Sequence, residues 1–293
     1  LALVMTRFKT LFHRYPRICL LALSLVLGFL LVLFASPSTS ILFPGASGDS
    51  YYGDAKTFLI LGSSLGKGYT PYIDVFDHEG LYIYYYTFIA SYLGPHGVMI
   101  PQTLLLSATV FVLSMTFFRL KVNLYSSIFG ICLFLALYLL FGQSPNDADM
   151  VLPFAAAMIH FYALGLKGND NSLLWKGNLF AGVAAGIALN IRLSDAMLPF
   201  AFVIFFAVKA IKDRKFNLVL TNALICLLGL VCASLPPLLH ALTGGFLKEM
   251  VEAVIISNFR YVGAFSQKGN DAIWNYLFLG AMVISFGIFQ INY

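Results

Sequence analysis

The strongest constraint on this chain is a series of apolar runs that recurs along almost the whole sequence. Each run is nearly long enough to cross a lipid bilayer, whose hydrocarbon core of about 30 Å takes a helix of about 20 apolar residues. The eight runs are Ile18–Ser36, Ile100–Phe118, Leu124–Phe141, Met150–Leu166, Gly177–Ile191, Ala196–Val208, Leu218–His240 and Ala272–Ile291. They exclude a soluble domain with a single anchor, and they predict an all-α polytopic membrane protein with about eight transmembrane helices.

The composition supports the same class. Hydrophobic residues make up 60% of the chain and charged residues 11%, whereas about 25% of residues are charged in soluble proteins. All four cysteines lie inside apolar runs, so we interpret them as small buried residues. The basic run 209–215 needs no partner beyond anionic lipid headgroups, and we expect a lipid bilayer but no nucleic acid among the partners.

The segment Gly80–Gly94 decides the topology. Its 15 residues would form a helix of roughly 22 Å, too short to cross, and its many tyrosines suit a helix at the membrane–water boundary. If it does not cross and the N-terminus is cytoplasmic, twelve of the eighteen basic residues face the cytoplasm; if it crosses, only eight do. The positive-inside rule favours the first arrangement, with both termini cytoplasmic.

This topology places eleven of the thirteen acidic residues on the outer face. Five of them fall in one stretch of the large outer loop 37–99: Asp49, Asp54, Asp74, Asp77 and Glu79. Clustered carboxylates are not needed to span a bilayer, so we place the functional site in this loop.

The same loop has local structural signals. Tyr51–Leu65 has the apolar spacing of an amphipathic helix, Gly66-Lys67-Gly68 breaks it, and Thr70-Pro71-Tyr72 predicts a turn. The four ionisable residues Asp74, Asp77, His78 and Glu79 follow. Like charges this close favour a shared cation, so we predict these four as ligands of a divalent metal such as Mg, Mn or Zn.

The loop pattern contains Asp54, Phe58, Gly62, Gly66-Lys67-Gly68, Pro71-Tyr72, Asp74, Asp77-His78 and Gly80. It resembles the first outer loop of GT-C membrane glycosyltransferases, in the branch of protein mannosyltransferases and aminoarabinose transferases. Weaker similarities follow at Asp147-Ala148-Asp149, at Asn190-Ile191-Arg192 and at Asn258-Phe259-Arg260-Tyr261. The resemblance covers residues 1–293 as one GT-C-like domain. Members of the family usually continue through further spans, so we expect the C-terminal part of the family to lie beyond this sequence.

The resemblance implies transfer of a sugar from a polyprenyl-phosphate donor to a glycan, lipid or protein acceptor outside the plasma membrane. Asp54 would be the catalytic base with Asp49 as the alternative, and Asp149, or else Asp147, would orient the acceptor. The donor phosphate would meet His78, Arg192, Arg260 or Lys268, beside Asp74 and Asp77. For Arg192 we weigh this role equally against simple interfacial anchoring.

Glu79 departs from the family, which usually has lysine after Asp-His. An acid there repels phosphate unless a metal intervenes, an arginine replaces the contact, or the chain is a non-catalytic homologue. A transporter or lipid-glycan flippase is the rival class, and it would place ionisable residues in mid-membrane. The clearest polar residue inside a run is His160, which we interpret as a hydrogen-bonded packing histidine.

Overall fold

The computed structural model describes residues 14–35, 53–94, 97–141, 147–191, 196–212, 214 and 216–257. These residues form helices joined by turns. An isolated bridge between Pro71 and Val75 is the only strand-like pairing in this part of the chain. The predicted all-α class is therefore confirmed for the described residues.

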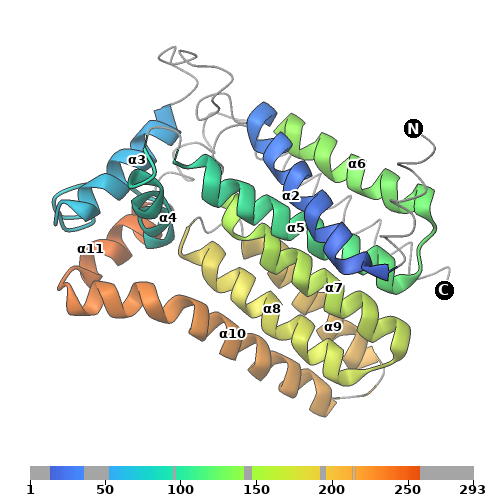
Figure 1. The fold of residues 1–293 in the computed structure, drawn as a ribbon. Coiled ribbons are helices and arrows are strands. Elements are labelled where there is room, and N and C mark those ends of the chain that lie inside the picture. The colour runs from blue at the N-terminus through green and yellow to red at the C-terminus, as the bar shows by residue number, and fades with distance from the viewer. Residues whose placement is uncertain are drawn as a thin grey trace, which may run out of the picture.

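Seven helices pack side by side and make up most of the molecule (Figure 1). They are α2 (Pro16–Ala35), α5 (Met99–Leu120), α6 (Leu124–Phe141), α7 (Leu152–Gly168), α8 (Asn171–Leu189), α9 (Met197–Lys212) and α10 (Phe216–Thr243). The shorter elements are α3 (Gly53–Gly66), α4 (Leu81–Ser91), the 3-10 turn η1 (Asp147–Met150), α11 (Leu247–Val251) and the π-helical turn η3 (Glu252–Ser257).

The predicted number of spans was wrong. Four helices among the described residues are long and apolar enough to cross a membrane, namely α2, α5, α8 and α10. Helices α7 and α9 form where spans are predicted, but they have only 17 and 16 residues. Their lengths of ~26 and ~24 Å are shorter than the hydrocarbon core of about 30 Å. The described apolar part of α6 is Leu124–Leu139. The predicted run Ala272–Ile291 lies outside the described residues.

Local capping sets the boundary between α7 and α8. Asn169 adopts a left-handed conformation with φ 47°, and its N–H donates to the carbonyls of Gly165 and Leu166. Asp170 then caps α8 by accepting a hydrogen bond of 2.8 Å from the Ser172 N–H. Hydrogen bonds from the Ser172 hydroxyl and then from its N–H lower the pKa of Asp170. A left-handed residue followed by an N-cap ends one helix and begins the next.

Helix α8 packs closely against α10 through small residues. A Cβ added to Gly182 would lie 1.9 Å from the carbonyl oxygen of Cys226, and one added to Gly229 would lie 2.3 Å from that of Leu179. Only glycine permits this approach of the two backbones, which is how apolar helices gain van der Waals contact in a membrane. The small residues of α8 thus allow it to lie directly against α10.

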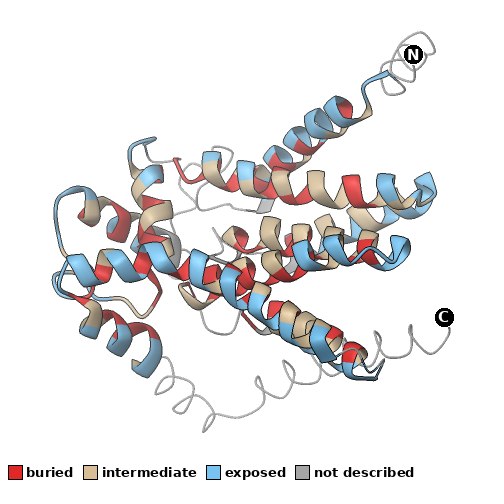
Figure 2. Cartoon of the chain, turned by 90° about the horizontal axis from the view of Figure 1, so that it is seen from below, coloured by how far each residue is buried: buried red, intermediate tan, exposed pale blue. Residues whose placement is uncertain are grey.

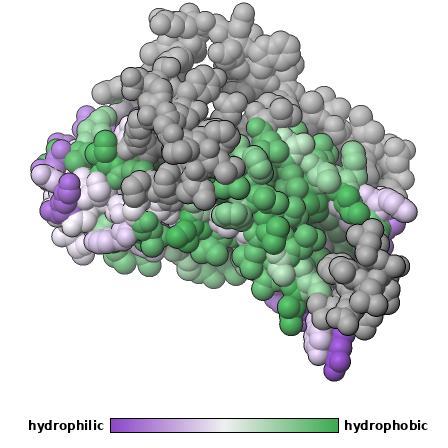
Figure 3. All heavy atoms as spheres, turned by 45° about the horizontal axis from the view of Figure 1, so that its top comes forward, coloured by the Kyte–Doolittle hydropathy of each residue, from purple (hydrophilic) through white to green (hydrophobic). Residues whose placement is uncertain are grey.

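Burial and hydropathy have the distribution expected for a membrane protein. Buried residues lie where helices face one another, and exposed residues cover the outer faces (Figure 2). Many exposed residues are large and apolar, including Leu220, Leu224, Leu227 and Val231 along α10. Hydrophobic residues gather over the middle of the face in Figure 3, with hydrophilic residues toward its two ends.

Helices α3, α4 and α11 lie together at one end of the long helices (Figure 1). They share one buried cluster with α8 and α10, which includes Leu61, Tyr84, Ile187, Ala241 and Phe246. The predicted helix at 51–65, its break at 66–68 and the short helix at 80–94 are all present. Helix α4 has 11 residues, or ~16 Å, so it is too short to cross a bilayer.

Candidate functional site

The turn between α3 and α4 is built from its own backbone. The Tyr72 N–H donates to the Val75 carbonyl at 2.9 Å, and the Asp74 N–H donates to the Thr70 carbonyl at 3.0 Å. Tyr72 has φ 65°, a conformation that only a well-supported turn imposes on a tyrosine. The Asp74 carboxylate accepts from the Thr70 N–H at 2.7 Å, so it closes this turn.

The next three residues form an acid–histidine–acid arrangement. His78 Nδ1 lies 3.4 Å from Asp77 Oδ1, and His78 Nε2 lies 3.5 Å from Glu79 Oε1. The His78 side chain is 43% exposed, whereas that of Glu79 is 3% exposed. Glu79 therefore points into the protein, and His78 is the member that solvent reaches.

Two buried tyrosines hold this turn from the protein side. Tyr72 Oη donates to the Glu79 carbonyl at 3.0 Å, and Tyr84 Oη donates to the Val75 carbonyl at 3.3 Å. Burial raises the pKa of both phenols, and the nearby Asp77 carboxylate adds to the shift. Both hydroxyls therefore stay protonated and remain hydrogen-bond donors.

The loop is tied to the end of α8 through its backbone. The Gly80 N–H donates to the Ile191 carbonyl at 3.0 Å, and the Tyr82 N–H donates to the Asn190 carbonyl at 3.4 Å. A Cβ on Gly80 would lie 1.8 Å from the Asn190 oxygen, so this contact requires glycine. It brings Ile191, the residue that precedes Arg192, against the loop 70–80, which we call the acidic loop.

Asp149 forms a second polar centre, which we call the Asp149 cluster and define as Asp149, Gln102 and Tyr138. Tyr138 Oη lies 2.9 Å from each oxygen of Asp149, and Gln102 Nε2 donates to Oδ2 at 2.8 Å. Asp149 is 1% exposed and Gln102 fully buried. The cluster joins η1, α5 and α6, so a buried carboxylate is fixed by donors from two other helices.

Helix α4 lies beside both polar centres. Tyr84 bonds the acidic loop, and the pKa of Tyr86 is raised well above its usual value by burial and then by the Asp149 carboxylate. The Tyr86 hydroxyl is buried and has no hydrogen-bond partner among the described residues. One short helix thus connects the loop to the Asp149 cluster.

An apolar cavity opens beside the Asp149 cluster. Its volume is ≈ 440 Å³, within the range of about 300–1,000 Å³ that ligand sites occupy. It is lined by Tyr82, Tyr85, Tyr86, Ile89, Pro101, Leu104, Leu105 and Met150. Tyr82 also donates to the Ala233 carbonyl, and Tyr85 Oη bonds His240 Nδ1 at 2.7 Å, so this wall of the cavity is anchored to α10.

Several predicted site residues lie outside the described part of the chain. Asp54 is the second residue of α3, but its side chain is among those not described, as is that of Asp147. The others outside the described residues are Asp49, Arg192, Arg260 and Lys268. Their roles stay predictions.

The predicted metal ligands fit a shared ion only in part. His78 lies between Asp77 and Glu79, but the Asp74 carboxylate bonds the Thr70 N–H instead. Within the described residues, no three His, Cys, Asp or Glu side chains are arranged to hold a metal ion.

Gln102 and Tyr138 were missed in the sequence. Gln102 is a polar residue inside the apolar run 100–118, and that signal was available. Its link to Tyr138 and Asp149 depends on the packing of α5 and α6 and has no local pattern.

Comparison of the chain with protein-family models, curated proteins and solved structures finds no match.

Proposed function

We propose that this chain is a GT-C-type membrane glycosyltransferase that moves a sugar from a polyprenyl-phosphate donor to an acceptor outside the cell membrane. The proposal places the acidic loop, α4 and the Asp149 cluster on the extracytoplasmic side.

The observation that supports it best is the apolar cavity beside the Asp149 cluster. A polyprenyl chain needs an apolar wall that ends near polar groups, and three tyrosines of α4 provide such a wall. The cavity lies against the same short helix that holds the acidic loop. The polyprenyl chain and the donor phosphate would then both bind beside α4.

The transfer step needs a base and a partner for the leaving phosphate. In the proposed step, the Asp54 carboxylate, or that of Asp49, takes the proton of the acceptor hydroxyl. The acceptor oxygen forms a bond to the anomeric carbon of the sugar, and the bond from that carbon to the phosphate oxygen breaks. The polyprenyl phosphate leaves with both electrons of that bond.

His78 is the proposed histidine contact of the phosphate, which would replace the carboxylate of Asp77 or Glu79 at one of its ring nitrogens. Its ring is the exposed member of the acid–histidine–acid arrangement, and Glu79 is turned inward against it. The inward position of Glu79 means that the acid does not face an approaching phosphate directly. Arg192, which follows a residue bonded to Gly80, is the proposed second cation.

A transfer assay with the full chain in lipid nanodiscs tests the proposal. The probes are undecaprenyl-phosphate hexose and pentose labelled in the sugar, with a cell-envelope extract as the acceptor mixture. We expect Asp54→Asn to lower transfer by about 10²–10⁴-fold, because an amide cannot take the proton. Asp170→Asn, at the N-cap of α8, is the matched control and should transfer at the unsubstituted rate.

The alternatives give different results in the same preparation. Unchanged transfer by Asp54→Asn would move the base to Asp49. Donor binding without transfer by the unsubstituted chain would favour a non-catalytic homologue. Movement of the labelled donor across vesicles, without transfer, would favour a flippase. A Leu104→Trp variant, which fills the apolar cavity, should weaken donor binding if the polyprenyl chain lies there.

A further inference from the structure

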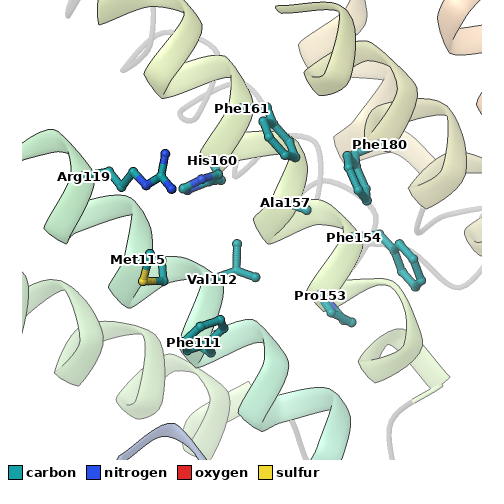
Figure 4. Close-up of a pocket in the computed structure, with 10 residues that line it drawn as sticks. All are labelled: Phe111, Val112, Met115, Arg119, Pro153, Phe154, Ala157, His160, Phe161 and Phe180. Carbon is teal, nitrogen blue, oxygen red and sulfur yellow. The ribbon is translucent and has the colours of Figure 1, made fainter. Parts of the chain in front are cut away.

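A second cleft lies between α5, α7 and α8 (Figure 4). Its volume is ≈ 430 Å³, and its walls are mainly aromatic, from Phe111, Phe154, Phe161 and Phe180. Two polar side chains, Arg119 and His160, lie together at one end of it (Figure 4). From Phe111 to Arg119 the helix rises roughly 12 Å, so Phe111 and Arg119 lie far apart along the cleft.

The orientation of His160 is set by Thr116. The Thr116 hydroxyl donates its single hydrogen to the Val112 carbonyl at 2.7 Å, and His160 Nδ1 lies 2.8 Å from the same oxygen. His160 Nδ1 must therefore donate to Thr116, since that hydroxyl has no second hydrogen. With Nδ1 protonated, Nε2 of the neutral ring can only accept a hydrogen bond, on the side where Arg119 lies (Figure 4).

Arg119 offers its guanidinium to the cleft. Its side chain is exposed, and no carboxylate of the described residues forms an ion pair with it. Lys176 adds a second positive charge nearby, with its Nζ 5.9 Å above the ring of Phe161, which stacks on Phe180. Lys167 donates to the Leu120 carbonyl at the same end of α5. Positive charge therefore gathers around the polar end of an aromatic cleft.

This combination suits an anionic amphiphile. A guanidinium binds phosphate oxygens through two parallel N–H donors, and basic pockets between membrane helices bind lipid headgroups. The phenylalanine walls suit an acyl chain, which neither a free phosphate nor a nucleotide supplies. The end of α5 that holds Arg119 lies away from α3, α4 and α11 (Figure 1), so this cleft is separate from the proposed transfer site.

We propose that the cleft binds an anionic phospholipid of the bilayer, with its phosphate on Arg119 and one acyl chain along Phe111 and Phe154. The site is independent of the proposed transferase activity, because it shares no residue with the acidic loop or the Asp149 cluster. Bound lipid would fix the packing of α5 against α7 at the end remote from the loop.

Native mass spectrometry of the detergent-purified full chain tests this proposal. The probes are phosphatidylglycerol and phosphatidylcholine with the same acyl chains. We expect retention of phosphatidylglycerol in preference to phosphatidylcholine. Arg119→Gln should weaken phosphatidylglycerol binding about tenfold, the effect of losing one charged hydrogen-bonding group. Lys248→Gln, an exposed basic residue on α11, is the matched control and should bind normally.

Two further measurements separate the possible ligands. Ala157→Phe should reduce lipid retention by filling the cleft while Arg119 is kept. Inorganic phosphate at millimolar concentration should fail to displace the lipid, because it has no acyl chain. Equal binding of both lipids, normal binding by Arg119→Gln, normal retention by Ala157→Phe or displacement by inorganic phosphate would each overturn the proposal.

Discussion

The acidic loop and the Asp149 cluster both contain buried carboxylates, but they are assembled differently. The loop is closed mainly by neighbours in sequence: Asp74 bonds Thr70, and His78 lies between Asp77 and Glu79. The Asp149 cluster takes Gln102 from α5 and Tyr138 from α6. A local arrangement can shift as a unit when a ligand arrives, whereas a cluster shared by three elements is fixed by their packing. We therefore expect substitutions in the two regions to lower the free energy of unfolding by different amounts.

The largest expected loss of stability is at the Asp149 cluster. Asp149→Ala leaves the Tyr138 hydroxyl without its acceptor and leaves Gln102 Nε2 with its 3.2 Å bond to Tyr138 Oη, at about 2 kcal/mol for each hydrogen bond lost. We expect the free energy of unfolding to fall by about 4 kcal/mol, measured by denaturant titration in detergent. Adding Gln102→Leu should recover part of this loss, because it removes one of the two donors. A further loss in the double variant would show that Gln102 acts through packing instead.

The next largest effect is at the tie between the loop and α8. Gly80→Ala places a Cβ against the Asn190 oxygen, so we expect a loss of about 3 kcal/mol. Gly168→Ala is the matched control, since its Cβ would meet only Asp170 at 3.9 Å. Equal melting temperatures for the two variants would show that the loop does not rest on α8 in solution.

Disruption within the loop itself should cost less. Asp74→Ala removes one exposed hydrogen bond to the Thr70 N–H, worth about 1 kcal/mol. Thermal unfolding should therefore separate this variant clearly from Asp149→Ala. A loss as large as that at Asp149 would mean that Asp74 supports more than its own turn.

A further effect, seen only at alkaline pH, is expected on α4, between the two regions. Burial, and then Tyr82, raise the pKa of Tyr85 to about 12, above the usual value of about 10. Unfolded Tyr85 ionises first as the pH rises, so stability is constant below about pH 10 and falls between about pH 10 and 12. Tyr85→Phe should make this fall shallower in unfolding experiments at pH 9 and pH 11. An identical pH dependence would place the alkaline loss at Tyr72 or Tyr84.

The sequence predicted the parts of the fold that have local causes. The glycines at 66 and 68 end α3, the turn forms at Thr70–Tyr72, and α4 follows. The number of spans was wrong because α7 and α9 have 17 and 16 residues, and an apolar run of that length does not show whether its helix reaches across a bilayer. The clustering of acids in the sequence identified the acidic loop. It did not predict the burial of Glu79, because that burial depends on how His78 and Tyr72 pack around it. Gln102 and Tyr138 join Asp149 only through helix packing.

The backbone bond between Gly80 and Ile191 has a consequence for the order of assembly. The loop and α4 emerge from the ribosome well before the end of α8, so their docking surface does not yet exist when they are made. Local turns can form at once, but the loop reaches its final place only after a contact between distant parts of the chain. Until then the aromatic face of α4 is uncovered. Because α4 is short and rich in tyrosines, it suits the membrane–water boundary. It would stay at that boundary without aggregating until α8 is complete.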